Sequence, residues 1–331
     1  MGKNWIKRCL IASGATRTAG IFASKKAVIL MYHSVMDDPT RLALSLGEII
    51  HSTAVFRGQM ELLARKYHPV SLDDVLLFVR GEKDLPARPV VLTFDDGYAD
   101  NHDVAMPILN QTGVPATFYV TVNCVETGTL PWPSHLRHAF LTTRRSQWEE
   151  AGGTIWPLKQ AAERQQAFQC ASGHAARLAG QLQNEFVHSV EAQLEVVPPD
   201  KTEKLMMTWE QVRGLAANGH SVGSHTLTHP NMAHITDGEA ATEMAQSKHQ
   251  LEQALRAPIV HFSYPCPALS PHWKKSTLEL SRKLGYLTAV TTDAGQVRRH
   301  DDPLSLHRTR PTKDVDGLHW NLECSFLGQP R

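Results

Sequence analysis

The sequence of 331 residues offers little support for a disulfide-stabilised fold. Its cysteines number only five, an odd count, and no two of them form a CxxC pair. Such a set predicts neither a disulfide framework nor a zinc–cysteine site, and it favours a reducing compartment. The five are scattered along the chain: Cys9, Cys124, Cys170, Cys266 and Cys324.

Long apolar runs are also lacking, which bears on location. No window of about 18 apolar residues occurs, so we expect no transmembrane span. The apolar stretch 9–12 is too short for the hydrophobic region of a signal peptide. Position 6 is isoleucine, where an N-myristoylation signal has serine or threonine. We therefore expect a cytoplasmic protein, while peripheral membrane association through the N-terminus and export stay open as alternatives.

Clustered charge is the third absence. The formal net charge is only +1, and no basic run alternates with aromatic residues, so we expect no nucleic-acid partner. Hydrophobic residues make up 42% of the chain, which is enough for a sizeable core. The unusual abundance is histidine, with 18 residues, and this supply makes a metal site easy to build.

The hydrophobic pattern alternates between short apolar runs and stretches of helical periodicity. Capping residues support the helices, with Ser71 before one and Thr208 before another. This order is typical of a parallel sheet wrapped by helices. Strands are expected at 27–32, 90–93, 116–122, 220–223, 259–264, 287–292 and 304–308. Helices are expected at 53–67, from 72, and at 103–111, 209–219, 237–255 and 272–284.

The segment 124–205 interrupts this alternation. It is rich in Gln, Ala, Glu and Arg, and much of 158–194 has a helical pattern. We interpret the segment as an insertion between two strands of the sheet. It is expected to act as a helical buttress or, alternatively, as a lid that shapes the substrate site.

Two adjacent carboxylates, Asp95 and Asp96, follow the apolar strand 90–93. Functional groups collect at the carboxyl ends of parallel strands, and Gly97 permits a tight turn there. Neighbouring acids raise each other's pKa, so the pair is costly unless a cation neutralises one of them. The simpler alternative is a turn with an aspartate cap.

His225 and His229 are four residues apart and follow another predicted strand. An HxxxH pair arises by chance in a histidine-rich chain, and Pro230 ends any regular helix here. One aspartate with two histidines is nevertheless a standard open site for zinc or a similar divalent ion. The coincidence of both motifs at strand ends therefore predicts a metal site.

Two weaker motifs also follow strands. Residues 262–267 read Phe-Ser-Tyr-Pro-Cys-Pro, and residues 306–308 read Leu-His-Arg. A rigid proline loop and a packed histidine are the simple interpretations of these segments.

Taken in order, these motifs resemble those of the polysaccharide deacetylases of carbohydrate esterase family 4. Thr-Phe-Asp-Asp-Gly at 93–97 and His-Thr-Leu-Thr-His at 225–229 match its first two motifs fully. The third motif departs, because Ser263 stands for arginine and Pro267 for glycine. This segment, Met31–Val35 and Thr291–Gly295 resemble the branch with a YPYG-like third motif.

The resemblance implies a distorted (β/α) barrel of about five to seven parallel strands with the helical insertion at 124–205. The domain organisation expected is an N-terminal extension at 1–26 and a catalytic domain at 27–331. The implied activity is metal-dependent removal of N-acetyl groups from N-acetylhexosamine units of a polysaccharide or oligosaccharide, such as an exopolysaccharide or a chitin-like glycan. The oligomeric state is not indicated.

Residue by residue, the resemblance assigns the metal, most simply Zn²⁺ but alternatively Co²⁺ or Ni²⁺, to Asp96, His225 and His229. Asp95 would be the general base that takes a proton from metal-activated water. The backbone N–H of Cys266 would stabilise the oxyanion.

The remaining assignments are looser. His307 is the candidate general acid, because the family's late Leu-x-His motif has no clean copy. Tyr264 and Arg308 join Cys266 as candidate substrate-binding residues. In an alternative role, Arg308 replaces the missing arginine of the third motif and orients Asp95. His33 ends the first strand and faces the site in one alternative.

Two other functions fit the same residues. The departures at Ser263, Cys266 and Pro267 suggest a catalytically impaired glycan-binding module of the same fold. The second alternative is a hydrolase of another linear or cyclic amide. The intact pair Asp95–Asp96 favours an enzyme over a pure binder.

Overall fold

The computed structural model describes residues 26–37, 47–198 and 204–327. The expected N-terminal extension at 1–26 therefore lies almost wholly outside the described residues. The strands of the main sheet are β1 (Lys26–Tyr32), β4 (His68–Pro69), β5 (Pro89–Phe94), β6 (Ala116–Val120), β9 (Ser221–Ser224), β10 (His261–Ser263), β11 (Thr288–Ala294), β12 (Val297–Arg298) and β13 (Leu306–Arg308).

These strands form an almost closed barrel. The path runs β12-β1-β5-β6-β9-β10-β11-β13, and β4 pairs with β5 outside it. All pairs on the path are parallel except β12 with β1. The barrel closes where the chain after β13 meets β1, because Thr309 bridges Leu30, with a hydrogen bond from Thr309 N to Ile29 O of 2.7 Å. The (β/α) barrel is confirmed, but its sheet exceeds the expected five to seven strands, with eight on the path.

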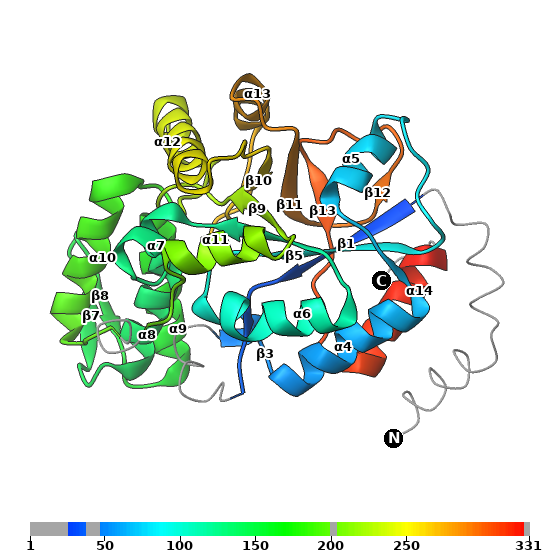
Figure 1. The fold of residues 1–331 in the computed structure, drawn as a ribbon. Coiled ribbons are helices and arrows are strands. Elements are labelled where there is room, and N and C mark those ends of the chain that lie inside the picture. The colour runs from blue at the N-terminus through cyan, green and yellow to red at the C-terminus, as the bar shows by residue number, and fades with distance from the viewer. Residues whose placement is uncertain (1–25, 38–46, 199–203, 328–331) are drawn as a thin grey trace.

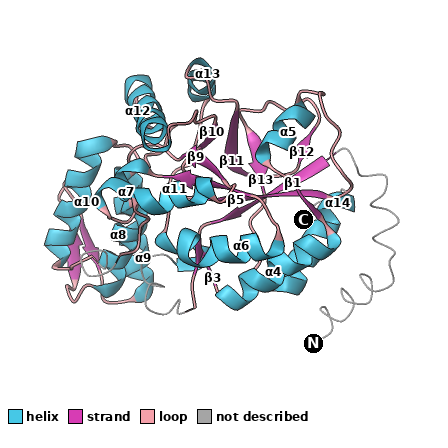
Figure 2. Ribbon diagram, in the orientation of Figure 1, coloured by secondary structure: helices cyan, strands magenta, loops and turns pink. Residues whose placement is uncertain are grey.

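Helices surround this sheet (Figures 1 and 2). Those that cover the barrel are α4 (Thr53–Lys66), α5 (Leu72–Val79), α6 (Met106–Thr112), α11 (Trp209–Ala217), α12 (Asp237–Leu255), α13 (Lys275–Lys283) and α14 (Val315–Leu327). The predicted caps are present, since Ser71 and Thr208 each form a capping box. Sequence reasoning missed α14, and it missed the short pair β2 (Ser34–Val35) and β3 (Ile50–His51).

Alternation along the strands divides the core into two parts. In β1, Val28, Leu30 and Tyr32 pack with the helices, while Ala27 and Ile29 belong to a second cluster. That second cluster unites residues of β1, β6, β11 and β13, which lie far apart along the sheet, with the apolar face of α5. Side chains of a strand alternate between faces. The second cluster is thus the barrel interior, and α5 closes one end of it.

The inserted segment has a core of its own. It contains α7 (Val122–Thr127), α8 (Trp132–Thr142), α9 (Ala161–Ala175), α10 (Gly180–Leu194) and the hairpin of β7 (Gln147–Glu149) and β8 (Ile155–Pro157). A separate cluster, including Leu136, Phe140, Trp148 and Val187, holds it together. Figure 1 shows this segment, in green, at one side of the barrel. None of the helices described has both the length and the apolar character needed to span a membrane.

Candidate active site

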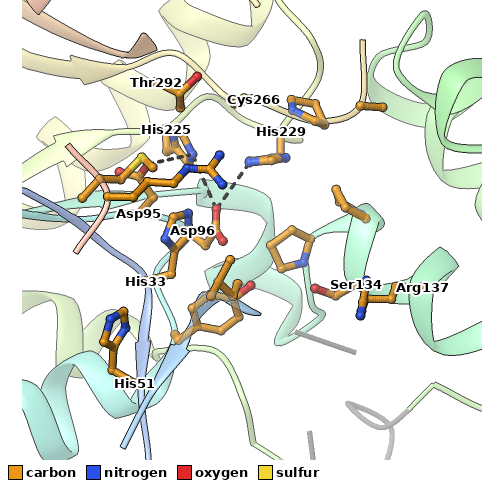
Figure 3. Close-up of a pocket in the computed structure, with 18 of the residues that line it drawn as sticks. His33, His51, Asp95, Asp96, Ser134, Arg137, His225, His229, Cys266 and Thr292 are labelled. Carbon is orange, nitrogen blue, oxygen red and sulfur yellow. Dashed lines mark ion pairs between the residues drawn. The ribbon is translucent and has the colours of Figure 1, made fainter. Parts of the chain in front are cut away.

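Two strand ends place an aspartate and two histidines together. Asp96 follows β5, and His225 and His229 follow β9, which is two strands away across β6. Asp96 Oδ1 lies 3.5 Å from His225 Nε2 and 3.3 Å from His229 Nε2. All three side chains are buried, and Figure 3 shows them meeting at the centre of the pocket, with His33 beside Asp96.

These residues fit a divalent metal ion. Asp96 Oδ1 is buried and, among the described residues, makes no hydrogen bond of ordinary geometry. His225 Nδ1 lies 2.8 Å from Ser263 O, so this nitrogen carries the proton and Nε2 presents a lone pair to the centre. Ligands of a tetrahedral zinc ion lie about 3.3–3.8 Å apart, given metal–ligand distances of about 2.0–2.3 Å. The two distances from Asp96 Oδ1 match this range, and all three ligand atoms lie within 4.8 Å of one another.

The backbone is strained at this point. Asp96 (φ 75°), Thr226 (φ 68°) and His229 (φ 62°) are non-glycine residues in the left-handed region, and Gly97 (φ 92°) follows Asp96. Such conformations cost about 1–3 kcal/mol each and persist where surrounding contacts impose them. The strain turns the ligand side chains toward one another, and no residue type in the sequence revealed it.

Two residues outside the motifs hold the histidine loop. The buried carboxylate of Glu243, on α12, accepts hydrogen bonds from Leu227 N (2.9 Å), Thr228 N (2.8 Å) and Thr228 Oγ1 (2.6 Å). Trp132, from the inserted segment, donates its indole N–H to His229 O at 2.9 Å. Sequence reasoning missed both. Glu243 is one glutamate among several on a long helix, and its place in the sequence gives no sign of such a role.

Asp95 has a different partner from Asp96. Arg308 forms a bidentate pair with it, with both N–O distances at 2.7 Å. The remaining guanidinium hydrogens go to Thr291 O (2.8 Å), Thr93 Oγ1 (3.2 Å) and Ser263 Oγ (3.1 Å), so all five donors have acceptors. Ser263 stands where the third motif has arginine. Its small side chain leaves room for an arginine that arrives from β13 instead.

The charges keep both carboxylates ionised. Burial by itself would raise the pKa of Asp95, but Arg308, His225 and His33 together lower it below its ordinary value. Burial also opposes ionisation of Asp96, yet the neighbouring imidazoles of His225 and His229 hold its pKa well below the usual range. The two adjacent aspartates thus have separate partners, the guanidinium of Arg308 for Asp95 and the two imidazoles for Asp96.

A cavity of about 460 Å³ opens onto this centre. The barrel contributes His33, His51 and Cys266 to its wall, and the inserted segment contributes Ser134, Arg137 and Phe168. Figure 3 shows Ser134 and Arg137 at the side of the pocket formed by this segment. The insertion therefore forms part of the cavity wall and is also a packed helical unit.

Other predicted site residues lie elsewhere. His307 is exposed, packs against Gly295, and is not among the cavity-lining residues, since alternation along β13 turns it away from Arg308. Tyr264 is buried, with its hydroxyl 2.9 Å from Ser281 Oγ, so it packs in the core. Arg308 is 1% exposed and contacts Asp95 instead of the cavity. Of the loosely assigned residues, Cys266 and His33 line the cavity.

The sequence is similar to those of known polysaccharide deacetylases. The family model for polysaccharide deacetylases matches residues 82–289. A Bacillus subtilis protein named as a polysaccharide deacetylase, YxkH, is 22% identical over 293 residues, covering 88% of this chain and 74% of that protein. The poly-β-1,6-N-acetyl-D-glucosamine N-deacetylase of Escherichia coli is 34% identical over 101 residues, which are 30% of this chain and 14% of that protein.

Solved structures show the same fold. The deacetylase PplD of Streptococcus pyogenes, in complex with acetate, superposes with a TM-score of 0.60 at 20% identity, covering 90% of this chain and 98% of that one. IcaB of Ammonifex degensii gives a TM-score of 0.58 at 19% identity, covering 90% and 97%.

Proposed function

Because this chain belongs to the polysaccharide deacetylase family, we propose that it removes N-acetyl groups from N-acetylhexosamine units of a polysaccharide or oligosaccharide. The observation that carries the proposal is the division of charge between two neighbouring aspartates. Asp96 faces two histidines in a set that fits a divalent cation, while Asp95 is held ionised by Arg308. A base beside a metal site suits amide hydrolysis and has no purpose in a protein that only binds glycan.

Asp96, His225 and His229 would hold the ion, with zinc the simplest choice for one carboxylate and two imidazoles. When bound, such an ion lowers the pKa of water and polarises an amide carbonyl. Asp95 would accept the proton of the attacking water. Arg308 would orient its carboxylate and keep it ionised, so that a base is available at neutral pH. The backbone N–H of Cys266 would donate to the developing oxyanion.

For the proton required by the leaving amine, we propose His33 in place of His307. His33 lines the cavity, and its charge couples to both Asp95 and Asp96, whereas His307 lies outside the cavity. Burial lowers the pKa of His33, and the two aspartates oppose that effect. The protonated ring would therefore be most favoured while both carboxylates are ionised.

The substrate proposed is poly-N-acetylglucosamine or a related exopolysaccharide. This rests on the Escherichia coli relative named for that polymer and on the open cavity, which has walls from both the barrel and the inserted segment. We also propose that residues 27–331 act as one catalytic domain in which the insertion shapes the glycan site.

The test is acetate release from oligomers of β-1,6- and β-1,4-linked N-acetylglucosamine. We expect release to stop in the presence of a chelator and to return on addition of Zn²⁺ or Co²⁺. Binding of the oligomers without any acetate release, in protein shown to carry the metal, would contradict the proposal and favour a glycan-binding module. Hydrolysis of cyclic imides alone, without acetate release, would favour a hydrolase of another linear or cyclic amide.

A further inference from the structure

A second cluster of metal-ligand residues lies in the inserted segment, away from the catalytic cavity. Glu150, Cys170 and His174 place one ligand atom each within 4.8 Å of one another. Within the described ranges this is the one such cluster besides Asp96, His225 and His229. We propose that it is a second divalent-cation site, of the class that takes zinc, and that it fastens the hairpin β7–β8 to α9.

The local sequence explains the convergence. Cys170 and His174 are four residues apart in the last turns of α9, so their side chains share one face of the helix. Glu150 begins the turn of the hairpin, where Glu150 N donates to Thr154 O at 2.9 Å and Gly153 N donates to Glu150 O at 2.8 Å. The hairpin packs on α9, and this brings its carboxylate over the helix face.

The distances suit a metal ion. Cys170 Sγ is 3.3 Å from Glu150 Oε2, and His174 Nε2 is 3.4 Å from Glu150 Oε1. The two contacts use different oxygens of Glu150, and each distance lies within the spacing of about 3.3–3.8 Å between ligands of tetrahedral zinc. Thiolate, imidazole and carboxylate are all ordinary zinc ligands, and the sulfur disfavours magnesium or calcium. The His174 side chain is 43% exposed, so water can complete the coordination.

Neighbouring groups orient two of the three ligands. Trp156 donates its indole N–H to Glu150 Oε2 at 2.9 Å, and the His174 ring stacks on Phe186 at a centroid distance of 6.0 Å. Groups of this kind behind metal ligands fix the ligand orientation and strengthen binding.

The site has a structural consequence. A hairpin of two three-residue strands is marginal by itself. An ion at Glu150, Cys170 and His174 would link it to α9, the helix whose Phe168 lines the catalytic cavity. The same helix packs near Leu269, in the loop that carries Cys266. Metal binding here would therefore stiffen one wall of the substrate site without touching the reacting atoms. The proposal is independent of the activity proposed above.

The experiment measures bound zinc per chain in protein equilibrated with Zn²⁺ and freed of excess ion. We expect two ions in the unmodified chain, one in Cys170→Ala, one in Asp96→Asn, and none in the double variant. The control for Cys170→Ala is Cys324→Ala on α14, which lies on the opposite side of the molecule (Figure 1). The control for His174→Ala is His188→Ala on α10. The controls should each retain two ions.

Cobalt gives a second readout that does not depend on activity. Asp96→Asn loaded with Co²⁺ should show a thiolate-to-cobalt charge-transfer band. The band should be lost with Cys170→Ala and persist with Cys266→Ala, which excludes the cysteine of the catalytic cavity as its source. Circular dichroism checks that each variant is folded, and His174→Ala replaces Cys170→Ala if the latter is not. One zinc per chain in both the unmodified protein and Cys170→Ala, with no such band in Asp96→Asn, would overturn the proposal.

Discussion

The two clusters of metal-ligand residues differ in what holds them. Asp96, His225 and His229 are buried, come from the ends of two strands, and are set by strained backbone and by Glu243, Trp132 and Ser263. Glu150, Cys170 and His174 are partly exposed and come from one helix and one short hairpin. The first geometry depends on the whole barrel, and the second depends on local packing within the insertion. We expect the catalytic cluster to tolerate far less change.

The largest difference should appear in activity. Asp95→Asn removes the base and keeps the shape of the side chain, so turnover should fall about 10²–10⁴-fold while bound zinc is unchanged. Cys170→Ala should have the reverse profile, losing zinc with a much smaller loss of turnover. Acetate release and metal content measured on the same samples provide the check. Full activity in Asp95→Asn would remove the basis for the proposed mechanism.

The second expected effect concerns the support of the histidine loop. Glu243→Ala leaves Leu227 N and Thr228 N buried without their acceptor, at a cost of about 1–3 kcal/mol. Zinc affinity at the catalytic site should weaken about 10–100-fold, the usual effect of losing a group that orients metal ligands. Gln246→Ala, at an exposed position on α12, is the control. Equal zinc affinities in the two variants would mean that the loop needs no such anchor.

The sequence predicted that Asp96, His225 and His229 lie together, but not which residues support them. TFDDG and HxxxH follow apolar strands, and both the barrel and the residues of this cluster follow from that order. The contacts of Glu243 and Trp132 join residues far apart in the chain, and no local pattern marks them. His307 lies outside the cavity because neighbouring side chains of a strand point to opposite sides, and it is Arg308 that points toward Asp95. The second cluster escaped notice because its cysteine has no cysteine partner in the sequence.

A third effect should appear as a shift along the pH axis. Arg308 opposes the effect of burial on Asp95 and keeps its pKa low. Arg308→Lys retains a charge but loses the bidentate pair, so the pKa of Asp95 should rise. A base must be ionised to act. The acid limb of kcat/KM should therefore move to higher pH. Arg282→Lys on the surface is the control. An acid limb that does not move in Arg308→Lys would mean that Arg308 does not set the pKa of Asp95.

The smallest expected effect is on the pH dependence of stability, which should differ between a buried histidine near the barrel and an exposed histidine of the insertion. Burial, with a contribution from Lys313, lowers the pKa of His51 to about 4, from 6.5 in an unfolded chain. Its contribution to stability is thus complete above about pH 6.5 and is lost as pH falls toward about 4. In His51→Gln, the free energy of unfolding in urea should fall by about 1–3 kcal/mol less over this pH range than in the unmodified protein. His188→Gln in the insertion should leave the slope as it is, and equal slopes in both variants would contradict the assignment.

The pair between Asp95 and Arg308 also has a consequence for biosynthesis. The two residues are 213 positions apart, and the arginine belongs to the strand that completes the barrel. At a synthesis rate of about 5–20 residues per second, roughly 10–40 seconds pass between the appearance of the carboxylate and that of its partner. During this interval the nascent chain carries both aspartates without the arginine. A ribosomal product that stops before β13 would contain every residue of the first two motifs and still lack a competent base.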